Sequence, residues 1–238
     1  MKHNYNKVLF FSTLIALIGF PLLSSAQDEE PVINFSKGKW HTGITLSVNT
    51  DDDDDIENIL FNISKNEQEN FEINFTGGYF VKDNMSIGLQ YSYLKHSQDL
   101  NYQTDDESPR YQSAKSVHTF TGFLRNYYPV TANHRLNFFN ETNLGVGFGN
   151  TNTRHTKSED DITKTFNDEF NLRLGVKPGV AVILTEGFAF EVALKLLGLD
   201  YTHSDITTNG IKQGSSSDFK LDFDISLLSL DFGLAYYF

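Results

Sequence analysis

The last eleven residues of the chain alternate between large apolar side chains and small or polar ones. A period of two predicts a β-strand with two unlike faces. The strand ends the sequence on an aromatic residue, with no polar residue after it. Such an end is unfavourable in water, whereas aromatic residues are favoured where a transmembrane strand meets the membrane interface. The apolar positions are Leu228, Leu230, Phe232, Leu234, Tyr236 and Phe238.

The start of the chain has the layout of a secretory signal peptide over residues 1–26. A basic start precedes an apolar run over residues 8–23, and small residues lead up to Ala26. We expect cleavage after Ala26, then a periplasmic lead segment over residues 27–37 and an outer-membrane domain over residues 38–238. An uncleaved membrane anchor is the alternative.

The composition excludes several classes of site and partner. The chain has no cysteine, which removes disulfides, thiol nucleophiles and thiolate metal ligands. Acidic residues outnumber basic ones by 31 to 19, and a nucleic-acid-binding protein needs a basic surface. We expect neither a nucleic-acid partner nor a cofactor. After the signal segment, no stretch is long and apolar enough for a transmembrane helix.

Eight segments after the signal peptide show strand-like alternation, with apolar or aromatic residues at every second position. The fourth segment is weaker than the others. The apolar phase of the last one changes near residues 227–228, which predicts a bulge or an extension above the membrane. The segments are 40–48, 71–79, 87–93, 120–128, 138–148, 172–182, 190–196 and 228–238.

The connections between these segments alternate in length. Outer-membrane barrels have short periplasmic turns and longer extracellular loops, so the alternation favours this class. An even number of strands then places both ends of the domain in the periplasm. The short connections are 81–84, 129–135 and 185–188, and the long polar ones are 50–69, 97–114, 151–168 and 202–218.

The charged residues of these segments avoid the apolar faces. A Lys or Arg that faces lipid at the bilayer midplane costs about 2–4 kcal/mol, so a membrane barrel should direct its charges inward. An eight-stranded barrel is just wide enough to be filled by side chains, and buried charges need partners. We therefore expect a sealed lumen, in which Arg125 and Glu141 face each other across a hairpin. The predicted lumen charge network is Glu72, Arg125, Glu141, Arg173, Lys177, Glu191, Lys195 and Asp231.

Several stretches resemble those of a known family. Residues 77–89 resemble the strand–turn–strand signature of small outer-membrane β-barrels, and residues 123–128 resemble their arginine-and-tyrosine strand. Residues 175–180 and the terminal aromatic Phe238 match as well. The resemblance is to porin-family or OmpA/OmpX-type eight-stranded barrels and extends over residues 39–238. It implies an integral protein of the Gram-negative outer membrane.

An acidic run is the most conspicuous polar feature outside the strands. Carboxylate oxygens suit a hard cation such as calcium. As an EF-hand the run fails, because Ile56 occupies the glycine position and Asn62 the closing glutamate position. A solvated loop that collects divalent ions weakly is the favoured interpretation, and a specific cation site is the alternative. The run consists of Asp51, Asp52, Asp53, Asp54 and Asp55.

The outward faces carry only fragments of a catalytic set. His118 lies near Ser116, and lipid hydrolases embedded in barrel walls combine serine, histidine and an acid. No acid stands close to them on that face, so we expect no catalytic residue and no enzymatic activity. A secreted lipocalin-like calyx would need the reverse arrangement, with an apolar interior and a polar exterior.

The combined prediction is an all-β, eight-stranded antiparallel up-and-down transmembrane β-barrel in the cell outer membrane. We expect a structural or surface-interaction role, with a charge-plugged lumen and acidic extracellular loops. A narrow porin-like channel for small solutes is the alternative, and a lipid-acting barrel enzyme ranks below it. The expected partners of this monomer are outer-membrane lipids, the barrel-assembly machinery through the C-terminal strand, and an extracellular partner of the loops.

Overall fold

The computed structural model describes residues 35–48, 63–102, 109–131, 133–157, 161–185, 187–223 and 230–238. The predicted signal peptide, most of the lead segment and the run Asp51–Asp55 lie outside the described residues. Among the residues that the structure describes, no helix is long and apolar enough to cross a bilayer.

Ten antiparallel β-strands make up the described part of the chain. They are β1 (Trp40–Val48), β2 (Ile63–Lys82), β3 (Met85–Tyr102), β4 (Arg110–Pro129), β5 (Leu136–Thr156), β6 (Ile162–Thr185), β7 (Phe188–Leu194), β8 (Leu197–Thr208), β9 (Ile211–Phe223) and β10 (Leu230–Tyr237). The predicted all-β antiparallel fold is confirmed, but the described residues form ten strands where the sequence predicted eight.

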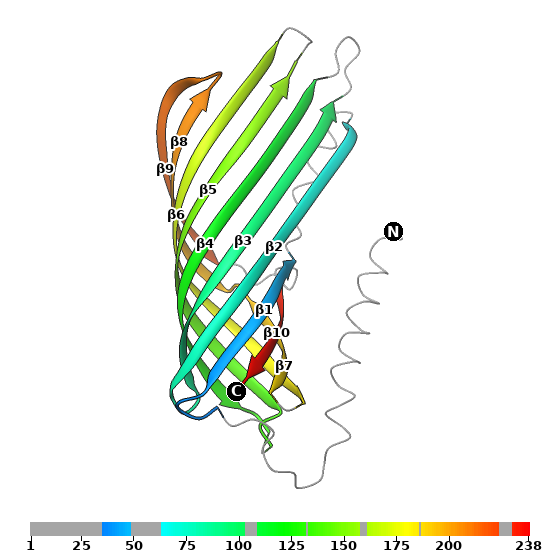
Figure 1. Ribbon diagram of the computed structural model, residues 1–238. Helices are drawn as coiled ribbons and strands as arrows, with labels where there is room; N and C mark the ends of the chain where they lie inside the picture. The colour runs from blue at the N-terminus through cyan, green and yellow to red at the C-terminus, as the bar shows by residue number, and fades with distance from the viewer. Residues whose placement is uncertain are drawn as a thin grey trace.

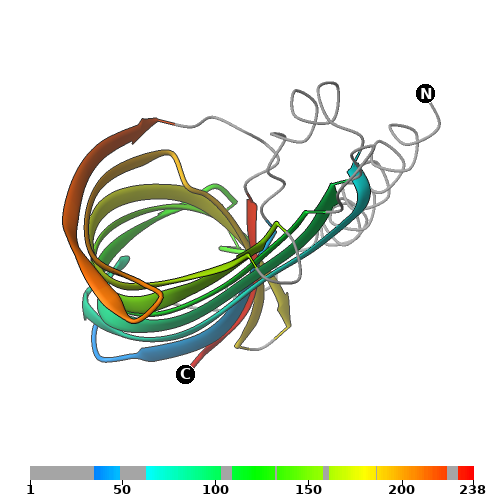
Figure 2. The ribbon, with the colours of Figure 1, turned by 90° about the horizontal axis from the view of Figure 1, so that it is seen from above.

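Eight of the ten strands close into a ring in the order β1–β2–β3–β4–β5–β6–β7–β10. The ring closes where β10 returns to β1, with Ile44 opposite Leu234. β8 and β9 continue beside the far half of β6, from Val176 opposite Leu197 to Thr165 opposite Thr208. Figure 2 shows the ring from above, with this pair along one wall.

The two ends of the ring differ. At the short-turn end, β2–β3, β4–β5 and β6–β7 are joined by short connections, and β10 ends beside the start of β1 (Figure 1). At the long-hairpin end, β3–β4, β5–β6 and β8–β9 rise well above β1, β7 and β10.

A bulge separates β7 from β8 at the end of the seventh predicted strand, 190–196. Val176 faces Leu197 and Gly179 faces Ala193, so two residues of β6 stand opposite three on the other strand. One of the two is Pro178, which has no N–H to donate to a neighbouring strand. The extra residue reverses the inward and outward faces. The even-numbered positions, which face outward in β7, therefore do not face outward in β8.

The interruption between β9 and β10 lies at the same level. Phe223 faces Leu197, and Leu230 faces Leu194. The predicted change of phase near residues 227–228 falls within this interruption. Residues 224–229 themselves lie outside the described part of the chain.

The long polar stretches predicted as loops are mostly strand. The β3–β4 ladder extends to Asn101 opposite Arg110, and the β5–β6 ladder to Thr156 opposite Ile162. A strand needs about 9–11 residues to cross a bilayer, so the 24 residues of β6 extend far beyond one. Polar side chains do not interrupt a ladder whose backbone groups are all paired, and this is why the loop prediction was wrong.

The β8–β9 hairpin turns at Asn209 and Gly210, within the predicted loop 202–218. Both residues have positive φ, 50° and 79°, as a type I′ turn requires. The backbone N–H of Asn209 donates to the carbonyl oxygen of Lys164 at 2.8 Å, which ties the tip to β6.

The side chains of the ring alternate between exposed apolar and buried polar. Leu89 is 73% exposed and Phe120 60% exposed on the outer face, whereas the neighbouring inward positions are largely buried. This matches the faces predicted from the sequence. Val182 is an exception, because its side chain is buried, with Leu136 and Phe190 opposite it on β5 and β7.

We predict that a disulfide across the β1–β10 seam will form in the Thr45→Cys/Gly233→Cys variant. These residues are partners, and a Cβ on Gly233 lies 2.9 Å from Oγ1 of Thr45. After boiling without reductant, the oxidised chain should migrate faster on a denaturing gel than the reduced chain. The control Thr45→Cys/Ala235→Cys should not cross-link, because diagonal Cβ atoms lie about 7–8 Å apart. A cross-link in the control alone would contradict the register.

Candidate functional site

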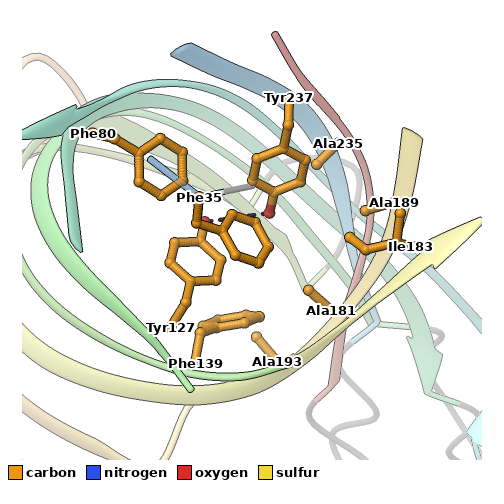
Figure 3. Packing of buried hydrophobic residues seen from close by; sticks show 10 residues of the cluster. All are labelled: Phe35, Phe80, Tyr127, Phe139, Ala181, Ile183, Ala189, Ala193, Ala235 and Tyr237. Carbon is orange, nitrogen blue, oxygen red and sulfur yellow. Dashed lines mark hydrogen bonds between the residues drawn. The ribbon is translucent and has the colours of Figure 1, made fainter. Parts of the chain in front are cut away.

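An aromatic layer fills the lumen at the short-turn end (Figure 3). Phe35, which precedes β1, is 1% exposed and stacks on Tyr127 of β4 with ring centroids 4.5 Å apart. Its ring also meets the edge of Tyr237 of β10 at 5.2 Å and lies 5.6 Å from that of Phe80. Phe35 belongs to the segment predicted as a periplasmic lead, so the last residues of that segment are part of the packed domain.

Arg125 stands next to this layer and binds two buried carboxylates. Its Nε and Nη2 donate to Oε2 of Glu141 at 2.9 and 2.8 Å. Its Nη1 donates to Oε2 of Glu191 at 2.9 Å and to the hydroxyl of Tyr127 at 3.2 Å. The guanidinium carbon lies 4.4 Å from the ring centroid of Phe139, at cation–π distance.

The remaining oxygens of the two carboxylates also have partners. The hydroxyl of Tyr237 donates to Oε1 of Glu191, and Nδ2 of Asn143 donates to Oε1 of Glu141 at 3.1 Å. A buried ion pair is stable only when such additional hydrogen bonds offset the cost of desolvation. This cluster meets that condition, so it can close the lumen as a rigid polar layer.

Four more members of the predicted network meet one level further from the short-turn end. Lys177 lies 3.0 Å from one carboxylate oxygen of Asp231, and Lys195 lies 3.5 Å from the other. Lys195 also binds Glu72 at 3.2 Å. The residues come from β2, β6 and β10 and from the bulge after β7, so their contacts link strands on different sides of the ring.

Arg173 is the one member of the predicted network that lies apart. Its Nε is 3.5 Å from Asp200 of β8, a residue that the sequence analysis did not include. Lys115 and Glu169 were also missed, and they form a 2.6 Å pair between β4 and β6. Continuing the inward parity of β4 and β6 beyond the apolar residues would have found this pair.

Above these pairs, toward the long-hairpin end, lies a cavity of about 590 Å³ that we call the cup. The charged layers form its floor, through Glu72, Lys177 and Lys195. Its walls come from β3, β4, β5, β6, β8 and β9. The walls include Gln90, Lys115, Thr119, Asn143, Arg173 and Lys220.

The other candidates from the sequence do not assemble into a site in the described residues. No group of three His, Cys, Asp or Glu side chains among them could hold a metal ion. The ring nitrogen Nδ1 of His118 is 2.7 Å from the hydroxyl of Tyr91. Ser116 donates to Oδ1 of Asn150 at 3.4 Å, so the nearest partners of the histidine and the serine are on different strands.

Comparisons with known proteins place the chain among outer-membrane proteins. A family model described as "Outer membrane protein beta-barrel domain" matches residues 12–238. No curated protein matches the chain.

Three similar solved structures are also outer-membrane or surface proteins. Neisserial surface protein A is 12% identical, with a TM-score of 0.36, covering 85% of this chain and 98% of that one. A major outer membrane protein from Thermus thermophilus is 12% identical, with a TM-score of 0.40 and coverage of 84% and 99%. OprG from Pseudomonas aeruginosa is 13% identical, with a TM-score of 0.40 and coverage of 85% and 97%.

We predict that Arg125→Met will lower the free energy of unfolding by about 3–5 kcal/mol, because it leaves two buried carboxylates without their cation. Unfolding by urea in phospholipid vesicles can be followed by the fluorescence of Trp40, the only tryptophan. Arg110→Met is the matched control. Arg110 binds Asp99 with 48% of its side chain exposed, so its loss should cost less than about 1 kcal/mol. Equal losses in the two variants would contradict the importance of the buried cluster.

Proposed function

Since the chain belongs to the outer membrane protein beta-barrel domain family, we propose that it is a sealed, non-enzymatic barrel that anchors its long hairpins at the cell surface. Membership of the family confirms the small outer-membrane β-barrel and the outer-membrane location expected from the sequence. The structural and surface-interaction role is the further step that we propose.

The observation that carries this proposal is the two-layer closure of the lumen. Phe35, Phe80 and Tyr237 fill the short-turn end, and the carboxylates of Glu141 and Glu191 bind Arg125 directly above them. A conducting pore needs a continuous polar path, and the aromatic layer interrupts it. The buried ion pairs also join strands across the ring, which supports a role in mechanical stability.

The long hairpins support a role at the surface. Outer-membrane barrels place their short turns in the periplasm, so the long-hairpin end should face the outside. The β8–β9 tip presents Ile211, which is 67% exposed, beyond the level at which β10 pairs with β1. A macromolecular partner of these hairpins and assembly through β10 remain part of the proposal.

A narrow channel is the second candidate, because the cup already opens part of the lumen. We predict that the purified chain will show no steady current in planar lipid bilayers. The triple variant Phe35→Ala/Arg125→Ala/Glu141→Ala removes part of the aromatic layer and one charge of each sign from the seal, and it should produce measurable openings. Arg110→Ala, which changes an exposed pair, should stay silent. A steady open-channel current from the unmodified chain would overturn the sealed-barrel proposal in favour of the channel.

We also predict that His118→Ala leaves lipid chemistry unchanged. His118 is outward-facing and binds Tyr91, and our proposal assigns it no catalytic step. Release of fatty acids from phospholipid vesicles should be equally low for the unmodified chain and the variant. Hydrolysis by the unmodified chain that disappears in the variant would favour the lipid-acting enzyme instead.

A further inference from the structure

The lining of the cup is cationic although the chain as a whole is acidic. The formal net charge is −12. Two carboxylates line the cup, those of Glu72 and Asp200. Against them stand five cationic side chains, those of Lys115, Arg173, Lys177, Lys195 and Lys220.

Several of these cations keep free hydrogen-bonding capacity toward the cavity. Lys115 binds Glu169 at 2.6 Å, but an ammonium group has three donors and 36% of this side chain is exposed. Arg173 has five N–H donors, and 42% of its side chain is exposed; among the described residues its ion-pair partner is Asp200, at 3.5 Å. The carboxylate of Glu169 is only 9% exposed. The cationic side chains of Lys115 and Arg173 are therefore more exposed than the acidic side chains that pair with them.

Neutral polar groups cover much of the remaining wall. Hydroxyl and amide side chains donate and accept hydrogen bonds, which suits a ligand with several hydroxyl groups. The cup is within the range of about 300–1,000 Å³ typical of small-molecule sites. The neutral polar residues of the lining are Gln90, Ser92, Thr119, Thr121, Asn143 and Asn171.

Inward-facing glycines give this part of the lumen its width. A Cβ on Gly145 would lie 2.9 Å from Oγ1 of Thr121, and one on Gly175 would lie 2.7 Å from Oδ1 of Asn143. A Cβ on Gly147 would lie 3.1 Å from Oγ1 of Thr119. The polar side chains thus lie against bare backbone, and the centre of the lumen stays open.

We propose that the cup binds a small hydroxylated anion, a phosphorylated sugar, with its phosphate held by Arg173 and Lys220, which stand on either side of Asp200 in one row across β6, β8 and β9. Arginine and lysine suit phosphate because both form charge-assisted hydrogen bonds with it. The hydroxyl groups of the sugar bind the neutral polar wall. This proposal goes beyond the sealed-barrel function and does not depend on it, since a silent bilayer recording and an empty cup are separate outcomes.

The same chemistry can come from a free sugar phosphate or from the phosphorylated sugar headgroup of a membrane glycolipid. Equilibrium dialysis of the full chain in nonionic detergent with labelled glucose 1-phosphate, glucose and inorganic phosphate tests the free source. Micelles that carry a phosphorylated glycolipid or its dephosphorylated form test the membrane source. Binding that requires both sugar and phosphate supports the proposal in either arm, and the arm in which it occurs identifies the source.

Charge variants test which residues hold the phosphate. Arg173→Gln should weaken binding of glucose 1-phosphate, or of the glycolipid, by roughly tenfold or more, as expected for a lost charge-assisted contact. Asp200→Asn should strengthen binding several-fold, because it removes the carboxylate that competes for Arg173. A misfolded variant cannot produce that gain. Lys95→Gln is the matched control on the exposed face of β3 and should leave affinity unchanged.

A filling variant tests the location without changing any charge. Gly147→Leu places a side chain in the cup and should abolish binding. Gly122→Leu is the matched control, because a Cβ there meets nothing within 4 Å and Gly122 lies outside the cup. The proposal is overturned by inorganic phosphate or glucose alone binding as tightly as the sugar phosphate. It is equally overturned by no binding in either arm, or by affinity that both glycine variants leave unchanged.

Discussion

A charged side chain inside a barrel with an apolar exterior needs partners of opposite charge within the lumen. Arg125 is the clearest example of such a side chain. Its guanidinium binds Glu141, Glu191 and Tyr127, and each carboxylate has a second donor. Because these groups satisfy one another, this charged cluster is stable in a buried position. The alternation of every ring strand follows from this condition, since the wall must direct polar groups inward and apolar groups outward.

That alternation is also what made much of the fold predictable. A period of two is a local property, so the faces of Phe120 and Leu234 could be assigned from neighbouring residues alone. The inward position of Arg125 and Glu141 follows from the same parity, and their opposition follows from the short β4–β5 connection. Seven of the eight residues of the predicted network come together for this reason, with Arg173 pairing elsewhere.

The parts that were not predicted depend on information outside a single strand. Periodic hydrophobicity fades toward the long-hairpin end, so the far ends of β4 and β6 were predicted as loops (97–114 and 151–168). The Lys115–Glu169 pair lies next to these stretches and was missed for the same reason. The Asn209-Gly210 pair is a local signal for a hairpin turn, and a search for apolar periodicity alone does not detect it. The insertion of Phe35 into the lumen depends on residues of other strands, such as Tyr127. The bulge between β7 and β8 depends on how these strands pair with β6 near Pro178, and strand register cannot be deduced from the sequence of one segment.

The position of Phe35 between aromatic rings of three strands has a consequence for the order of assembly. The rings that surround it belong to Phe80 on β2, Tyr127 on β4 and Tyr237 on β10. This pocket is therefore complete only after the final strand has docked onto the first. A contact between positions 35 and 237 joins almost the two extremes of the folded region and is entropically among the last to form. The N-terminal aromatic ring is therefore a natural reporter of completed insertion, mobile while the cylinder is open and immobilised once it has shut.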